Sequence, residues 1–446
     1  MSTAPPSSSP LPPPAPPRPR PSGEKPGLVA DPVVRSLGLL IVVNATGNGL
    51  FLAISTLWFT RGLGYSTGQI GLALTLAGLC GVLAAYPAGR SADRYGAKRV
   101  LAVLHVFQAA AMAGFALVDT YPAFVLLACA VTAGSRANAA VRGALYAHSL
   151  PAATRTPALG LLRAVNNAGI GAGAALGAGV AALDHHGAYQ AAILVDALTF
   201  LLALLPLRAV PAVHPATGGS AGRPGAADRT GGSDRPDSSG LPGRRPGALR
   251  DRPYLAVTAL NAIVNMLYVV LEVALPLWLA GYTSAPRPLV GVLLVLNTVL
   301  VVALQVRASR GVTELPAAAR AFRLGGLLTA LACVTAAAAA HRAPAAATVI
   351  LLAAVLLLTL GEVTSQAGSW TLGYALAPDH AQGAYQGVFQ TGISLTQALG
   401  PVVVTTLVLP HGTVGWLVLG AVFSGAALAL PPTARRAERH RPAPPP

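Results

Sequence analysis

Twelve apolar stretches, each about as long as a helix that crosses a bilayer, constrain the fold of this chain more than any other feature. A membrane-spanning helix needs about 20 mainly apolar residues, with a rise of about 1.5 Å per residue. Hydrophobic residues make up 53% of the sequence and charged residues only 10%, which does not suit a water-soluble globule. We therefore expect an all-α integral membrane protein with twelve transmembrane helices. They are expected near residues 36–60, 67–88, 98–118, 122–146, 158–182, 188–208, 254–280, 287–306, 322–340, 345–366, 384–408 and 413–431.

The basic residues lie mainly in alternate segments between these stretches. The net charge is +16, but the charges are divided among short segments with few aromatic residues between them, so we expect no nucleic-acid partner. Lys and Arg favour the cytoplasmic side of a membrane. The segments on the opposite side hold only Arg61, Arg287 and Arg342. We therefore expect a multi-pass protein of the cell membrane with both termini in the cytoplasm.

Segments of different composition divide the chain. Residues 1–32 are rich in Pro and Ser and lack the apolar core of a signal peptide, which predicts a disordered cytoplasmic tail. Residues 209–252 are rich in Gly, Pro, Ser, Asp and Arg, which predicts a flexible linker. The linker separates an N-terminal six-helix bundle, 33–208, from a C-terminal one, 253–432. A basic cytoplasmic tail, 433–446, is expected to follow.

A short internal repeat suggests that the two bundles are pseudo-symmetric. Asn44 and Asn48 of the first apolar stretch recur 217 positions later as Asn261 and Asn265 of the seventh. The same shift aligns two arginines that follow the second and eighth stretches. Related halves of this kind are common in secondary transporters.

The polar segment between the second and third stretches has the sequence GRSADRYGAKR, residues 89–99. It is too short for a domain and predicts a tight turn on the cytoplasmic side. Its glycines allow close backbone approach and positive φ, and its basic residues indicate the cytoplasmic face. The candidate gating residues of this loop are Gly89, Asp93, Arg94, Gly96, Lys98 and Arg99.

This segment resembles the G-x-x-x-D-R-x-G-x-[KR]-[KR] loop between the second and third helices of the major facilitator superfamily. The resemblance implies two six-helix bundles that rock about a central site, giving alternating access. Gly169, Gly173 and Gly177 of the fifth stretch are similar to the G-x-x-x-G-P-x-x-G-G motif of the superfamily's drug–proton antiporters, although Ala174 and Ala178 replace its proline and last glycine. The chain is most similar to bacterial exporters of drugs and small molecules.

Two carboxyl groups inside the apolar stretches are candidates for proton coupling. Asp196 lies in the sixth stretch and Glu272 in the seventh, both well below the expected outer surface. Either group could take up and release a proton as a cavity opens and closes. The alternative is that each is a structural hydrogen-bonding residue. No metal, nucleotide or catalytic motif is present in the sequence, so neither an enzyme nor a cofactor is expected.

Amide side chains supply the candidate cargo contacts. Each asparagine pair is spaced i, i+4 and so lies on one helix face, and the resemblance places the first and seventh helices across the central cavity from each other. The alternative is that these amides make contacts between packed helices. The substrate-cavity candidates are Asn44, Asn48, Asn261, Asn265 and Gln390.

Charged residues near the cytoplasmic helix ends are candidates for gating latches. We expect Asp93 to pair with Arg142, and Glu362 with Arg307 or Arg310, when the cytoplasmic side is closed. Arg136 of the fourth stretch is a further latch candidate and is also the expected intramembrane cation.

These observations favour proton-coupled export of a small amphipathic or apolar organic compound by a monomer that contacts substrate, protons and lipid. A proton-coupled importer or facilitator of a small nutrient is the nearest alternative. An importer dedicated to anions is less favoured, because Arg136 would be its only intramembrane cation. A membrane sensor or scaffold that transports nothing is a further alternative, and it would bind a ligand without moving it.

Overall fold

The computed structural model describes residues 28, 30–183, 185–211 and 247–439. Nearly all of the expected N-terminal tail, most of the expected linker and the last seven residues therefore lie outside the described residues.

Six helical rods form the N-terminal half. They are α1 (Pro32–Leu57) continued by η1 (Trp58–Gly62), α2 (Thr67–Tyr95), α3 (Ala97–Leu117), α4 (Tyr121–Ser149), α5 (Ala152–Leu183), and α6 (His186–Leu202) continued by α7 (Leu204–Ala209).

Six further rods form the C-terminal half, after a short helical turn, η2 (Ala248–Arg250). They are α8 (Arg252–Asn265), α9 (Leu267–Val269), η3 (Val270–Ala274) and α10 (Leu275–Tyr282) as one rod; α11 (Leu289–Ser309); α12 (Leu315–Ala337); α13 (Pro344–Ala375); η4 (Asp379–Ala381) leading into α14 (Gln382–Val403), η5 (Val404–Val408) and η6 (Leu409–His411); and α15 (Gly412–Arg439).

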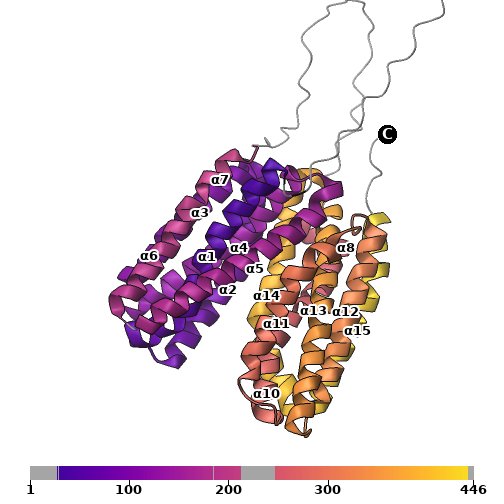
Figure 1. Cartoon of the computed structure of the whole chain (residues 1–446). Coiled ribbons are helices and arrows are strands. Elements are labelled where there is room, and N and C mark those ends of the chain that lie inside the picture. The colour runs from indigo at the N-terminus through magenta and orange to yellow at the C-terminus, as the bar shows by residue number, and fades with distance from the viewer. Residues whose placement is uncertain (1–27, 29, 184, 212–246, 440–446) are drawn as a thin grey trace, which may run out of the picture.

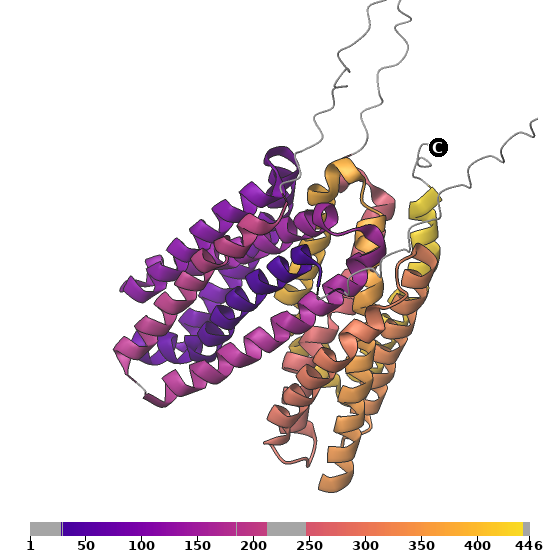
Figure 2. The ribbon, with the colours of Figure 1, turned by 45° about the horizontal axis from the view of Figure 1, so that its top comes forward.

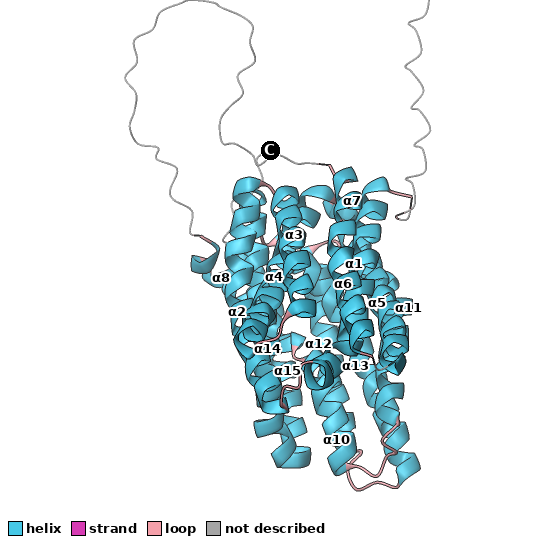
Figure 3. Cartoon of the chain, turned by 90° about the vertical axis from the view of Figure 1, so that its left-hand side faces the viewer, coloured by secondary structure: helices cyan, strands magenta, loops and turns pink. Residues whose placement is uncertain are grey.

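The rods agree with the predicted membrane spans. Ten helical stretches among the described residues are long and apolar enough to cross a membrane. One of them, Asp379–Arg439, contains both α14 and α15, which meet at Gly412, where φ is 55°. The remaining rod is α5, which is not one of the ten. The all-α fold is confirmed, and Figure 3 shows only helices and loops in the described part of the chain.

The rods form two bundles. In the N-terminal half α1 packs on α5, α2 on α4 and α3 on α6, whereas in the C-terminal half α12 packs on α13 and α15. Figures 1 and 2 show the ribbons of the two bundles close together at the end where α15 finishes and diverging toward the end that holds α10. The chain alternates in direction from rod to rod, so the start of α1, the end of α7, the start of α8 and the end of α15 share the first of these ends.

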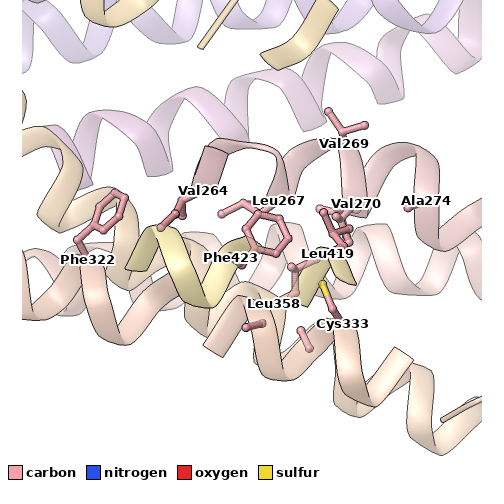
Figure 4. Close-up of a cluster of buried hydrophobic side chains, with 14 of the residues drawn as sticks. Val264, Leu267, Val269, Val270, Ala274, Phe322, Cys333, Leu358, Leu419 and Phe423 are labelled. Atoms are coloured by element: carbon pink, nitrogen blue, oxygen red, sulfur yellow. The ribbon is translucent and has the colours of Figure 1, made fainter. Parts of the chain in front are cut away.

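A buried apolar core fills the C-terminal bundle. Side chains of α8, η3, α12, α13 and α15 meet in it, among them Phe322, Cys333, Leu358 and Phe423 (Figure 4). The three described cysteines, which include Cys333, are free. Burial of such side chains supports the bundle from within, while many other leucines and valines stay exposed on the outer surface, as expected in lipid.

Equivalent contacts in the two halves show that the repeat distance differs from the predicted one. Asp31 caps α1 and Asp251 caps α8, each through its carboxylate. Trp58 Nε1 donates to the Phe115 carbonyl at 3.2 Å, and Trp278 Nε1 donates to the Ala336 carbonyl at 2.9 Å. The aspartates and the tryptophans are each separated by 220 positions, not 217. The two asparagine pairs are thus offset from symmetry by three residues, or about one helical turn.

Several predicted helix ends differ from the structure, among them the start of α12 and the end of α13, and two differences change the predicted loop and tail. The segment 89–99 is almost entirely helical, because α2 continues through Tyr95 and α3 starts at Ala97. The turn is Gly96 alone, with φ of 89°. At the other end of the chain α15 runs to Arg439, so residues 433–439 extend the last helix instead of starting a tail.

Candidate functional site

The two halves cross most closely where α2 meets α14. A Cβ atom built at Gly89 would overlap the carbonyl oxygen of Gly383, and one built at Gly383 would overlap the carbonyl oxygen of Gly89. Gly387, one turn further along α14, lies against Ala85 and Tyr86. Gly89 is therefore required for close contact between the halves, not for a turn.

Asp93 stabilises this crossing through two hydrogen bonds. Its Oδ1 accepts a hydrogen bond from the Gly383 backbone N–H at 2.6 Å, and its Oδ2 accepts one from the Ala384 N–H at 2.7 Å. These N–H groups belong to the first turn of α14, where the helix dipole favours a negative charge. The predicted pair of Asp93 with Arg142 was wrong for this structure, because α14 offers two backbone donors that take both carboxylate oxygens. Among the described residues Arg142 has no hydrogen bond or ion pair.

Two of the basic residues next to Asp93 make their contacts within the N-terminal half. Lys98 Nζ donates to the Arg208 carbonyl at 2.8 Å and to the Val210 carbonyl at 2.6 Å, and so caps the end of α7. The Arg94 guanidinium lies 5.2 Å from the ring centroid of Tyr95. Arg99 is exposed.

A stripe along α5 also contacts the C-terminal half. The hydroxyls of Thr156 and Thr371 are hydrogen-bonded at 2.7 Å. Gly160, one turn on, lies against Ser309 of α11. These residues form a second set of contacts between the halves.

The next residue of this stripe, Arg163, forms an ion pair with Glu362 of α13. Its Nη2 donates to Glu362 Oε1 at 2.6 Å and to the Tyr268 hydroxyl at 2.7 Å. The second carboxylate oxygen, Oε2, accepts from Asn297 Nδ2 at 2.9 Å. The side chain of Glu362 is 2% exposed and that of Arg163 is 26% exposed. This is a largely buried polar cluster between the halves.

The cluster corrects two predictions. Glu362 pairs with Arg163 and not with Arg307 or Arg310, both of which are exposed at the end of α11, away from the depth at which Glu362 lies. Arg136 is also not the only intramembrane cation, because Arg163 lies within α5. Arg136 is half-buried beside Gly81 of α2 and has no hydrogen bond or ion pair to the described residues.

Sequence reasoning missed Arg163 although a signal was present. Thr156, Gly160 and Arg163 are spaced i, i+4, i+7, which places small and polar side chains on one face of an otherwise apolar helix. A charged residue on such a face is a candidate for a contact with another helix.

The two predicted coupling carboxyls lie in different surroundings. Asp196 is fully buried. Its Oδ1 accepts from the Thr199 hydroxyl at 3.3 Å, and its Oδ2 has no partner among the residues that the structure describes. It lies against Gly47 of α1, inside the N-terminal bundle. Glu272, in contrast, is exposed and lies four residues beyond Tyr268, within electrostatic range of Glu362.

The asparagine pairs have the same internal geometry in both halves. Asn48 Nδ2 donates to Asn44 Oδ1, and Asn265 Nδ2 donates to Asn261 Oδ1, each at 3.1 Å. Asn261 and Asn265 also accept hydrogen bonds from two side chains of α13 in the same half, which fits the alternative of contacts between packed helices. Asn48 is exposed, and Gln390 of α14 is half-buried.

These features define a multi-pass helical membrane protein of two similar halves that are joined at one end. The chain belongs to the Major Facilitator Superfamily, whose family model matches residues 37–401. Members of this superfamily are transporters and not enzymes, and this chain is accordingly a membrane transporter.

Solved structures of the same fold are distant in sequence. A bacterial homologue of the iron transporter ferroportin, in an outward-facing state with soaked iron, has a TM-score of 0.69 at 13% identity, covering 92% of this chain and 100% of that one. The human organic anion transporter MFSD10 (TETRAN) has 0.65 at 15%, covering 91% and 100%. FucP in the outward conformation has 0.63 at 14%, covering 91% and 98%. Such similarity establishes the fold alone. No curated protein matches this chain significantly.

Proposed function

We propose that this transporter works by alternating access as a proton-coupled exporter of a small organic compound, and that its structure corresponds to the outward-facing state. The observation that carries the proposal is the joint between the halves, where Asp93 holds the start of α14 and Gly89 crosses Gly383. Away from this joint the two bundles diverge (Figure 1).

The distribution of charge supports a cytoplasmic position for the joint. Basic residues gather at the end of the molecule that holds it, whereas the opposite end holds Arg61, Arg287 and Arg342. Since positive residues favour the cytoplasmic side, both termini are assigned to the cytoplasm, in a cell-membrane protein that functions as a monomer.

Proton coupling is assigned to Glu272 and Asp196. Glu272 is exposed beside the polar cluster that joins the halves, so its protonation state can respond to their movement. Asp196 is buried and one of its oxygens has no hydrogen-bond partner among the described residues, so uptake of a proton would remove the cost of burying its charge. The direction of transport rests on the resemblance to exporters.

One observation favours the alternative of a proton-coupled importer or facilitator. Arg163 supplies an intramembrane cation of the kind that an importer of anionic nutrients needs, whereas Arg136 was the only one predicted from the sequence. Export remains the preferred direction because of the glycine spacing of α5.

A transport assay separates these functions. Cells that overproduce the chain are loaded with a panel of labelled compounds, and their release is followed with and without a protonophore. An exporter releases its cargo faster than control cells, and the protonophore abolishes the difference. An importer instead accumulates the compound from the medium. A sensor moves none of them, and Asp93→Asn would then leave every flux unchanged.

A further inference from the structure

Arg163 has hydrogen-bonding capacity that its neighbours do not use. A guanidinium carries five N–H donors, but both contacts of Arg163, to Glu362 and to Tyr268, are made by Nη2. Its Nε is buried and has no partner among the described residues. A buried donor without an acceptor costs about 1 to 3 kcal/mol in general. The site therefore lacks a hydrogen-bond acceptor next to Arg163.

Glu362 does not supply that acceptor in this structure, where its two oxygens accept from other donors. One of its oxygens accepts from Arg163, and the other accepts from Asn297, which also donates to Thr359 at 3.0 Å. The carboxylate is held on both sides and faces Nη2 of Arg163, so Nε has no acceptor in this arrangement of the described side chains.

Glu272 is the reverse case, a carboxylate acceptor without a donor among the described residues. It is exposed, and it has no hydrogen bond or ion pair in the part of the chain that the structure describes. It lies four residues beyond Tyr268, whose hydroxyl touches Arg163, and within electrostatic range of Tyr268 and Glu362. Tyr268 thus connects the two groups, because its hydroxyl accepts from Arg163 and Glu272 lies about one helical turn further along the same rod.

The charges restrict what can bind there. The site contains one positive side chain, Arg163, and two negative ones, Glu272 and Glu362. A simple anion would add a third negative charge, whereas a simple cation would leave Arg163 Nε without an acceptor. A compound with both an ammonium and a carboxylate group meets both requirements.

We propose that this cluster is a binding site for small zwitterions of the amino-acid class, with the carboxylate on Arg163 and the ammonium on Glu272. The proposal rests on the proposed function, since it names the class of the transported compound. Such a cargo contacts both halves at once, so it favours the conformation in which the halves close around it.

The test measures binding and needs no gradient. The purified full-length protein is heated in detergent and its unfolding is followed by tryptophan fluorescence, with each proteinogenic amino acid as probe. Each probe is paired with its amine and its acid, for example leucine with 3-methylbutylamine and 4-methylpentanoate. We expect at least one amino acid to raise the apparent Tm, and its amine and acid analogues to give much smaller shifts.

Variants assign the effect to the site. Glu272→Gln and Arg163→Gln should each abolish the Tm shift, and Arg163→Lys, which keeps the charge, should restore part of it. The matched controls Asp119→Asn and Arg287→Gln remove exposed charges from loops at the outer end and should keep the full shift. Arg163→Lys and Glu272→Gln keep the test informative if Arg163→Gln does not fold.

Three results would overturn the proposal: no amino acid raises the Tm of the folded wild-type protein, the amine or the acid alone acts as strongly as its zwitterion, or the shift survives in both site variants. A failure of the proposed function is distinguishable from these. A chain that binds amino acids but transports none refutes transport alone, and a chain that exports other compounds without binding zwitterions refutes only the cargo class.

Discussion

Arg163 of α5 and Glu362 of α13 form an ion pair between the two halves of the transporter, with 2.6 Å between Nη2 and Oε1. If the halves separated here, the two residues would keep different numbers of hydrogen bonds. Glu362 would keep Asn297, which belongs to its own half, but Arg163 would lose both Glu362 and Tyr268. Separation therefore leaves a guanidinium without a partner, and this cost stabilises the joined state.

The first prediction concerns this pair. Arg163→Gln or Glu362→Gln should each cost about 3 to 5 kcal/mol, since each leaves the other charge uncompensated, and the double variant should cost less than the sum of the two. Apparent Tm values of the four proteins in detergent measure the coupling. The cycle of Arg307→Gln with Glu362→Gln serves as the control and should be additive. Coupling to Arg307 in place of Arg163 would contradict the observed pairing.

The second prediction concerns the joint at Asp93. Asp93→Asn removes a charge that accepts two backbone hydrogen bonds and places an amide N–H₂ against a donor of α14. Charge-assisted hydrogen bonds contribute about 1.5 to 3 kcal/mol each, so loss of about 2 kcal/mol should shift the equilibrium toward the inward-facing state about thirty-fold. Ala384 is buried in the joint, and a cysteine there adds only a sulfur atom to the existing Cβ. Labelling of Ala384→Cys by an impermeant thiol reagent, in a background without native cysteines, should become faster.

Ser91→Ala is the matched control for that experiment. Its hydroxyl donates only to the Pro87 carbonyl within α2, at 2.9 Å, so its loss should leave the labelling rate unchanged. Equal rates in Asp93→Asn and wild type would show that the carboxylate does not hold the joint closed.

The third prediction separates two glycines of one helix. Gly89→Ala introduces a Cβ that overlaps the Gly383 backbone, whereas Gly71→Ala has nothing within 4 Å. Only Gly89→Ala should prevent the joint from closing and slow transport, although both substitutions favour the helix by similar amounts. Flux in vesicles, normalised to the amount of protein, is the measurement. Similar losses for both variants would mean that the glycines matter for folding and not for the crossing.

The bundle architecture was predictable because lipid imposes a simple rule on sequence. A helix that satisfies its own backbone hydrogen bonds in a membrane needs a long apolar stretch, and every such stretch in this chain became a rod. The exact ends were less predictable. Residues such as Arg90 and Asp93 look like a loop because they are polar, but they form the last turns of α2, where one face contacts α14 and another meets water.

The pairing of charged side chains could not be predicted, because it depends on the register between helices that are distant in sequence. Asp93 and Glu362 were recognised as latch residues, yet each was assigned the wrong partner. Their partners are a helix N-terminus and Arg163, which lie 290 and 199 positions away. The repeat distance was wrong for a similar reason. The asparagine pairs have equal spacing in both halves, but they are displaced by about one helical turn relative to the equivalent aspartates and tryptophans.

The fourth prediction concerns the glycine stripe of α5. Gly169, Gly173 and Gly177 all lie against α1, and a Cβ at Gly173 would overlap the Thr46 carbonyl oxygen. Gly173→Ala should therefore destabilise the N-terminal bundle by about 1 to 3 kcal/mol through overpacking. Gly171→Ala, on the open face of the same helix, has nothing within 4 Å and should be neutral or slightly stabilising. Apparent Tm values that fall equally would place the effect in the helix itself and not in its contact with α1.

The last prediction tests the assignment of proton coupling. Glu272→Gln and Asp196→Asn keep the size of each side chain and remove its charge, so both should abolish proton-driven transport while membrane insertion is retained. They should differ in a second measurement, because Glu272 is exposed near the interface of the halves and Asp196 is buried within one of them. Exchange of labelled cargo across vesicles without a proton gradient should persist in Asp196→Asn if only coupling is lost, but should fall in Glu272→Gln if that carboxylate also contacts the cargo. Asp119→Asn, in an exposed loop, is the control and should keep both activities. Full pH-dependent flux in both variants would place coupling on another group, and Glu362, joined to Arg163, would be the next carboxylate to test.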